Sequence, residues 1–292
     1  MRALATVLAL AALSGGVPAA AAVAATGASG TEKQAVSSRW SFETTEGVGP
    51  VTVPDEADTA NVLTLHGGAV PTETWQVDVG GLALDGTGYA TAATVPVDTT
   101  GSFTLTAWAQ ADTAPTETVT VLSAEGSTRP AVQVSFVPDE GNPDSGVGTW
   151  RLSVADQDAS DAEVVVVDAA EVRDARDWTH LAVTYDATTK EARLYVDGVL
   201  LERACADDDG DGVADDAACA AFEPWAEDVT VFGASSFQIG RSGSGSDAGA
   251  YFSGLVDDVW AFEGALSDSQ IGLLSVSFFD VPTVVPGTGV GG

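Results

Sequence analysis

The sequence predicts an all-β fold, an antiparallel β-sandwich with one short helical turn near the C-terminus. Short segments rich in Val, Thr and aromatic residues follow one another from residue 38 onward, and Gly, Asp, Asn and Pro separate them. Only one later segment has a helical pattern, which excludes the parallel α/β class because that class needs a crossover helix between strands. Many short strands with regular turn signals are typical of an antiparallel sandwich.

Strand segments are recognised by the alternation of apolar and polar residues, which gives a strand one buried face. The alternation is clearest in segments 102–108, 150–154 and 179–185. The single helix is predicted after Ser267, because Ser267 and Gln270 have the spacing of a capping box before an apolar group that includes Ile271.

Two hairpins are predicted in the second half of the chain. Asp197 and Gly198 separate the apolar runs 193–196 and 199–201. Because both residues tolerate the positive φ of a type I′ turn, this pair is a strong hairpin signal. A second hairpin is expected around residues 186–191.

The composition excludes nucleic acid as a direct partner. The chain of 292 residues has 11 Lys and Arg against 43 Asp and Glu, a formal net charge of −32. Phosphate groups would be repelled, and no cluster of Lys or Arg is present to neutralise them. Anionic membrane surfaces are disfavoured for the same reason. With 45% hydrophobic residues the chain has enough apolar material for a core.

Residues 1–25 have the features of a secretory signal peptide. Arg2 provides a positive charge, an apolar run covers 3–13, and small residues before position 26 offer a cleavage site. A transmembrane anchor is disfavoured because Pro18 and two preceding glycines interrupt the run well short of the roughly 20 apolar residues that span a bilayer. We expect a secreted protein without membrane insertion, in which residues 26–37 form a linker.

Cys205 and Cys219 are the only cysteines of the chain. In an oxidising compartment such a pair most simply forms one disulfide. A bond between them would close a loop of about 15 residues, which the chain-entropy model values at about 3 kcal/mol. Two free thiols are the alternative, and export disfavours them.

The loop between the cysteines has the D-x-D-x-D-G pattern of an EF-hand-like calcium loop. Alternate carboxylates on a tightly curled backbone converge on one point, and Ca²⁺ takes six to eight oxygen ligands. The predicted ligands are Asp207, Asp209, Asp211, Asp215, Asp216 and the backbone carbonyl of Val213. Position 12 is Ala218 instead of Glu, so the loop resembles the calcium repeats of thrombospondin type 3 or dockerin-like segments more than a sensor EF-hand. The alternative is a solvated acidic loop without an ion.

Several motifs in a fixed order resemble a known family. The central motif runs from Trp178 through His180 to Asp186 and continues at 194–198. The flanking motifs are residues 40–42, 84–86, 101–108, 237–241, 252–259 and 265–271. Together they resemble the laminin G-like domains of the concanavalin A-like lectin/glucanase group. The resemblance implies a jelly roll over residues 38–280. From the pattern along the chain, we expect an insertion with the calcium loop at 202–227 and a flexible Pro- and Gly-rich tail at 281–292.

The resemblance also implies a second calcium site at the rim of the sandwich. The matching ligand positions are Glu43, Asp55, Asp257 and Asp258. The chain departs from the family pattern here, since Glu replaces the commoner Asp at the first position and no Ser-Gly follows Asp55. The alternative for Asp257 and Asp258 is a pair bonded to backbone amides. By the same resemblance, Trp178 packs in the sandwich and His180 bonds to neighbouring backbone.

The sequence shows no pair of acids with the spacing of a glucanase strand motif, so no catalytic residues are assigned. We expect a secreted, calcium-stabilised binding module for a glycan or an extracellular protein. The aromatic rings considered for stacking on a sugar are Trp75, Tyr89, Trp225, Tyr251 and Trp260. Two alternatives remain, a polysaccharide-active hydrolase with unrecognised acids and a structural surface protein.

Overall fold

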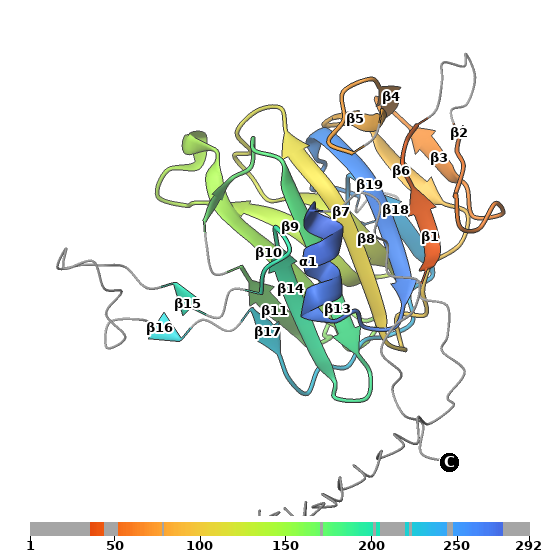
Figure 1. The fold of residues 1–292 in the computed structure, drawn as a ribbon. Helices are drawn as coiled ribbons and strands as arrows, with labels where there is room; N and C mark the ends of the chain where they lie inside the picture. The colour runs from red at the N-terminus through yellow and green to blue at the C-terminus, as the bar shows by residue number, and fades with distance from the viewer. Residues whose placement is uncertain are drawn as a thin grey trace, which may run out of the picture. The chain divides into compact units, whose positions relative to one another are not determined.

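Two antiparallel sheets packed face to face make up the body of the protein (Figure 1). The computed structural model describes residues 36–43, 52–77, 79–169, 172–200, 203–204, 220–221, 224–243 and 248–276. The predicted jelly-roll sandwich with a single short α-helix is confirmed.

The first sheet has eight strands. Its order is β17 (Trp225–Ala226), β14 (Glu191–Val196), β13 (Thr179–Asp186), β7 (Phe103–Ala111), β19 (Ser253–Glu263), β5 (Gly81–Asp85) and β4 (Val70–Thr72), and β1 (Val36–Trp40) also pairs with β19. The first and last strands of the described sequence are therefore neighbours in one sheet.

The second sheet has nine strands. Its order is β11 (Val164–Asp168), β10 (Val147–Ala155), β9 (Pro130–Pro138), β8 (Val119–Glu125), β18 (Ser236–Ile239), β6 (Tyr89–Ala92), β3 (Leu63–His66) and β2 (Thr52–Val53), and β12 (Arg173–Asp174) also pairs with β10. A short 3₁₀ turn, η1 (Pro143–Ser145), precedes β10. A separate two-stranded pair consists of β15 (Arg203–Ala204) and β16 (Ala220–Ala221).

The main core lies between the two sheets and follows the predicted alternation. The core face of β7 contributes Phe103 and Leu105, as expected. Aromatic rings from both sheets fill the centre: the ring centroids of Trp40 and Phe237 are 5.9 Å apart, and those of Phe136 and Trp150 are 5.1 Å apart. Burial of this apolar surface is the main stabilising contribution to the sandwich.

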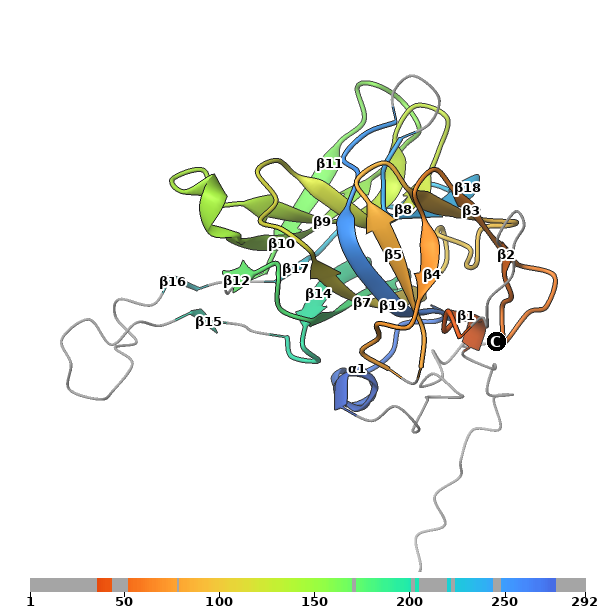
Figure 2. The ribbon, with the colours of Figure 1, turned by 90° about the horizontal axis from the view of Figure 1, so that it is seen from above.

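A second, smaller core covers the outer side of the eight-stranded sheet. Helix α1 (Asp268–Val276) lies there, as Figure 2 shows. It packs Ile271 and Leu274 against Tyr195 and Phe262 of the sheet. The helix begins as predicted, because Gln270 Oε1 accepts the Ser267 N–H at 2.9 Å.

The predicted turn at Asp197 and Gly198 is present. Their φ angles are 52° and 78°, both positive as a type I′ turn requires. Val196 and Val199 exchange two backbone hydrogen bonds across it. Of the strand expected at 199–201, the described residues 199 and 200 contribute a single bridge, at Val199.

The end of the segment expected to be an insertion takes part in the sheet. Trp225 and Ala226 form β17, which pairs with β14. No helix in the described part of the chain is long and apolar enough to cross a membrane.

Candidate ligand-binding site

The outward face of the nine-stranded sheet is polar. Gln133 on β9 and Gln238 on β18 each lie between two core residues, so the two-residue period of a strand turns both amides away from the core. The segment that follows β18 lies against this sheet, since the Thr120 N–H of β8 donates to the Ala250 carbonyl at 2.8 Å. The face and this segment together form the walls of a site.

A stack of three side chains crosses the face at one end. The rings of His66 on β3 and Tyr89 on β6 are stacked with centroids 4.6 Å apart. The guanidinium carbon of Arg241, just after β18, lies 3.3 Å from the centroid of the Tyr89 ring. Because β3 and β18 flank β6 on opposite sides, both faces of the Tyr89 ring are covered. Tyr89 therefore presents no ring face to a sugar, which corrects the role considered for it from the sequence.

Further contacts hold this stack in one arrangement. Arg241 donates from Nε to the Gln238 side-chain oxygen, and from Nη1 to the Tyr251 hydroxyl at 3.2 Å. The pKa of His66 is lowered, first by burial and then by the nearby charge of Arg241, so the imidazole is neutral at pH 7. The stack thus carries one positive charge, which is fixed by its hydrogen bonds.

Next to the stack lies a pocket of about 300 Å³. Residues 125–130 at the turn between β8 and β9 line one side, and Ser242, Gly243, Gly249 and Ala250 line the other. Gln133 also lines the pocket, and its Nε2 donates to Thr120 Oγ1 at 2.7 Å. The volume is at the lower end of the range of about 300–1,000 Å³ that is usual for small-molecule sites.

Glu125 is the acidic residue of the described pocket lining, and Arg129 is the basic one. Glu125 is 1% exposed, and its Oε1 accepts hydrogen bonds from Ser242 Oγ at 3.0 Å and from the Gly243 N–H at 2.9 Å. Ala124 lies in the core, so the two-residue period of β8 turns Glu125 to the outward face, and the register with β9 shifts between these two residues. Among the lining residues that the structure describes, Glu125 is the only carboxylate.

The other aromatic residues considered from the sequence have different surroundings. Trp260 is 6% exposed and packs against Phe262 in the second core, so it is structural. Trp75 is 45% exposed, and Trp225 is half-buried on β17. Tyr251 is half-buried and adjoins Ala250 of the pocket lining. Only Tyr251 therefore lies next to the pocket.

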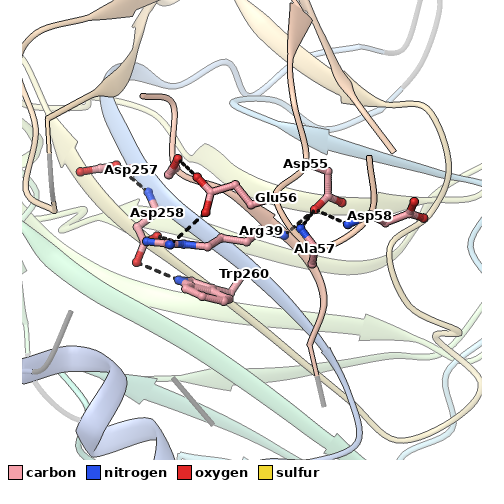
Figure 3. A network of polar contacts seen from close by, with 9 residues as sticks. Arg39, Asp55, Glu56, Ala57, Asp58, Asp257, Asp258 and Trp260 are labelled. Atoms are coloured by element: carbon pink, nitrogen blue, oxygen red, sulfur yellow. Dashed lines mark hydrogen bonds and ion pairs between the residues drawn. The ribbon is translucent and has the colours of Figure 1, made fainter. Parts of the chain in front are cut away.

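Three of the four rim residues expected to hold calcium, Asp55, Asp257 and Asp258, lie in a network of polar contacts around Arg39 (Figure 3). Asp258 Oδ1 accepts Arg39 Nε–H at 2.9 Å, and Asp55 Oδ1 accepts the backbone N–H of Arg39 at 2.9 Å. Asp257 accepts backbone N–H groups of Gln76 and Val77, both at 2.8 Å, which agrees with the alternative reading of this acid.

These contacts do not assemble the expected metal site. Within the described ranges, no three His, Cys, Asp or Glu side chains form a group that could hold a metal ion. Asp55 Oδ2 is buried without a hydrogen-bond partner, which fits a cation. In Asp257 and in Asp258, by contrast, both carboxylate oxygens accept hydrogen bonds, and this arrangement does not fit a cation. Glu43 is exposed. The described donor set therefore does not fit Ca²⁺, which requires six to eight oxygen ligands.

The surroundings of His180, on β13, and of Trp178, just before this strand, match the expectation only in part. His180 is 2% exposed and packs edge-on against Trp108, with ring centroids 5.2 Å apart. Its Nδ1 has no hydrogen-bond partner, so the expected bond from the ring to backbone is absent at this nitrogen. Burial lowers the pKa of His180 to about 3. Trp178 is half-buried.

The predicted calcium loop lies outside the described residues, and so do both cysteines. The described strands β15 and β16 stand on either side of it in the sequence. Ala204, one residue before Cys205, pairs with Ala220, one residue after Cys219. The calcium ligands at 207–216 and the disulfide remain predictions.

The pocket residues Glu125 and Gln133, and Arg241 in the neighbouring stack, were not identified from the sequence as site residues. A signal existed for two of them. Gln133 interrupts the apolar run of β9, and Glu125 ends an otherwise uncharged strand before Gly126. Without the sheet order, neither residue could be assigned to a pocket.

Comparison with known families gives one match. Residues 84–272 match the family model of the concanavalin A-like lectin/glucanases superfamily named Laminin_G_3. A comparison with curated protein sequences gave no significant match.

Several solved structures share the fold at low sequence identity. Domain 4 of AbnA, a GH43 extracellular arabinanase from Geobacillus stearothermophilus in complex with arabinotriose, has a TM-score of 0.54 and 18% identity, over 83% of this chain and 100% of that domain. The binding domain of Paraclostridial Mosquitocidal Protein 1 has a TM-score of 0.55 and 10% identity, over 85% and 53%. The binding domain of botulinum neurotoxin DC in complex with rat synaptotagmin II has a TM-score of 0.54 and 11% identity, over 84% and 52%. This chain thus spans about half of each toxin binding domain. At these identities the likeness concerns the fold alone.

Proposed function

Because the chain belongs to the concanavalin A-like lectin/glucanases superfamily, we propose that it is a secreted, calcium-stabilised binding module whose ligand is a glycan held in the Glu125 pocket. The observation that carries the proposal is the polar pocket of about 300 Å³ on the outward face of the nine-stranded sheet. A buried carboxylate, a side-chain amide and backbone groups line it, and these groups suit the closely spaced hydroxyls of a sugar. The arabinanase domain with bound arabinotriose supports this ligand class.

Binding is preferred to hydrolysis on chemical grounds. Glycoside hydrolases of the usual type use two carboxyl groups that flank the scissile bond, about 5–5.5 Å apart in retaining enzymes and about 6.5–9.5 Å apart in inverting ones. The described lining of this pocket contributes one carboxylate, Glu125, whose Oε1 is already held by Ser242 and Gly243. Such a fixed acceptor orients a hydroxyl group.

The calcium and the disulfide belong to the same proposal. The antiparallel pairing of Ala204 with Ala220 supports a disulfide between Cys205 and Cys219, because Cys205 follows Ala204 and Cys219 precedes Ala220, which are the next opposed positions of an antiparallel pair. A closed loop would reduce the ordering cost of gathering the aspartates at 207–216 around one ion. The calcium would stabilise the module and take no part in chemistry.

A binding experiment with two pocket variants tests the proposal. Wild type is titrated calorimetrically with arabinotriose and then applied to an array of neutral and acidic glycans. Glu125→Gln removes the charged acceptor, and we expect at least a tenfold loss of affinity, since hydrogen bonds to charged groups contribute about 1.5–3 kcal/mol. Gly249→Gln fills the pocket, because a Cβ at Gly249 meets no atom within 4 Å. Glu163→Gln, an exposed carboxylate outside the pocket lining, is the matched control.

The outcomes separate the candidate functions. The proposal is supported if Glu125→Gln and Gly249→Gln both weaken glycan binding and Glu163→Gln retains it. Release of reducing sugar, or binding that survives Gly249→Gln, contradicts it. Capture of an extracellular protein with no glycan bound would place the function with a protein ligand.

A further inference from the structure

Arg39 lies at the centre of the rim network and connects three parts of the chain. Its Nε donates to Asp258 Oδ1 on β19 at 2.9 Å, and its Nη1 donates to Glu56 Oε2 at 3.0 Å. Its backbone N–H donates to Asp55 Oδ1 at 2.9 Å. The ring of Trp260 lies against the guanidinium, with 4.4 Å between the ring centroid and Cζ (Figure 3).

The acids around Arg39 are engaged mainly by N–H and O–H donors. Asp258 Oδ2 accepts Trp260 Nε1–H at 2.7 Å, and Glu56 Oε1 accepts the Ser41 hydroxyl. Asp257 Oδ1 accepts the Asp258 N–H at 2.7 Å, in addition to the two N–H bonds at its Oδ2. One carboxylate oxygen differs from the others in this group of four acids (Asp55, Glu56, Asp257 and Asp258). Asp55 Oδ2 is the only one that is buried without a hydrogen-bond partner.

A single unpartnered oxygen, Asp55 Oδ2, does not make a calcium site, and the guanidinium of Arg39 already supplies a positive charge there. Ca²⁺ takes six to eight oxygens at about 2.3–2.6 Å. A divalent ion bound here would have to share Asp258 with a guanidinium that is 17% exposed and fixed by two ion pairs. Arginine keeps its charge when it is buried, and its planar fork can hold two acids at once.

We propose that the Arg39 guanidinium takes the place of a divalent ion at this rim, so that the junction of β1 with β19 is held without calcium. The register pairs Arg39 directly with Trp260 across the two strands, which brings the guanidinium over the indole ring. The guanidinium thereby neutralises Asp258, which is 8% exposed, because an ionised carboxylate is costly to bury without a compensating positive charge.

The test requires a protein in which the separate calcium loop is silent. The parent variant carries Asp207→Asn, Asp209→Asn and Asp211→Asn, and its melting temperature is measured in EDTA and in excess Ca²⁺. We expect the same melting temperature in both. In this parent, Arg39→Met lowers the melting temperature by on the order of 5–10 °C, because a nearly buried acid loses its partner. Arg39→Lys gives a smaller decrease, since an ammonium keeps the charge without the fork.

Arg176→Met is the control for general loss of an arginine. Its ion pair with Asp174 joins partners that are 49% and 30% exposed, and we expect a shift of about 2 °C or less. A calcium-induced rise in the melting temperature of the parent that Asp55→Asn removes would overturn the proposal. So would an Arg39→Met variant as stable as the parent. If Arg39→Met does not fold, the comparison of Arg39→Lys with the parent, in EDTA and in Ca²⁺, decides the question by the same criteria.

Discussion

His180 and Asp257 lie at paired positions on either side of Trp108. β13 pairs His180 with Trp108, and β19 pairs Asp257 with the same residue. Both side chains are almost completely buried, at 2% and 0% exposure. Burial disfavours the charged form of each group, and it therefore shifts the two pKa values in opposite directions. The stability of the sandwich at different pH values should show both effects.

The first prediction concerns acid. Burial lowers the pKa of His180 from 6.5 to about 3, so between these values the unfolded chain binds a proton that the folded protein does not. His180 therefore stabilises the fold above pH 6.5, and its contribution is lost as the pH falls toward 3. At pH 4 the loss amounts to about 3 kcal/mol. Urea unfolding of His180→Gln should show an acid decrease smaller by this amount.

The other histidine serves as the control for this experiment. His66 is half-buried, and His66→Gln should retain most of the acid decrease of the wild type. An unchanged acid decrease in His180→Gln would contradict the prediction.

The second prediction has the opposite sign. Burial raises the pKa of Asp257 from 3.8 to about 7, and the charge of Asp258 adds a smaller increase. Three hydrogen bonds from backbone N–H groups act in the opposite direction and lower the pKa. The folded protein holds the proton that the unfolded chain releases, so stability falls as the pH rises from 3.8 through 7. Between pH 5 and pH 8 this contribution is about 3 kcal/mol. Asp257→Asn should reduce the fall, whereas the exposed Asp161→Asn should leave it unchanged.

The third prediction concerns the second core. Ile271 and Leu273 lie on the same helix, but Ile271 is fully buried and Leu273 is 45% exposed. Ile271→Ala should cost about 2–5 kcal/mol of unfolding free energy through lost burial and the cavity that remains. Leu273→Ala should cost about 0.5 kcal/mol or less. Equal effects of the two changes in chemical denaturation would show that α1 does not pack as described.

The fourth prediction concerns the two cysteines. Mass spectrometry of the secreted protein should find Cys205 and Cys219 in one linked peptide, and a thiol reagent should label neither before reduction. The Cys205→Ser and Cys219→Ser double variant should lose about 3 kcal/mol of stability by the chain-entropy model. Labelling of both thiols in the unreduced protein would exclude the bond.

The fifth prediction concerns calcium. Addition of Ca²⁺ to EDTA-treated protein should release or absorb heat and raise the melting temperature, by mass action on the folded state. Asp209→Asn together with Asp211→Asn should abolish both effects, because two of the converging carboxylates are lost. Asp139→Asn changes an exposed acid outside this loop and should preserve both effects. A wild-type protein without heat or thermal shift would contradict the predicted site.

Local sequence was sufficient for the elements whose interactions are local. The alternation of apolar residues located β7, β10 and β13, because successive side chains of a strand point to opposite faces of the sheet. Asp197 and Gly198 indicated their turn because few other residues adopt positive φ at both positions. The capping pair Ser267 and Gln270 located the start of α1 for a similar reason.

The site, in contrast, depends on contacts between distant parts of the chain. Glu125 and Ser242, 117 positions apart, meet because the segment after β18 lies against β8. Arg39 and Asp258 are 219 positions apart, and only the pairing of β1 with β19 brings them together. The resemblance to the laminin G-like domains assigned the rim acids as metal ligands, and the sequence did not show that an arginine pairs with Asp258.

The sequence by itself thus determined the jelly-roll class, the strands, the turn and the helix start, since each follows from the preferences of neighbouring residues. Only the tertiary structure decided which polar side chains line a common pocket and which acids are paired with an arginine. Sheet order and register set these distances, and they depend on the packing of the whole sandwich.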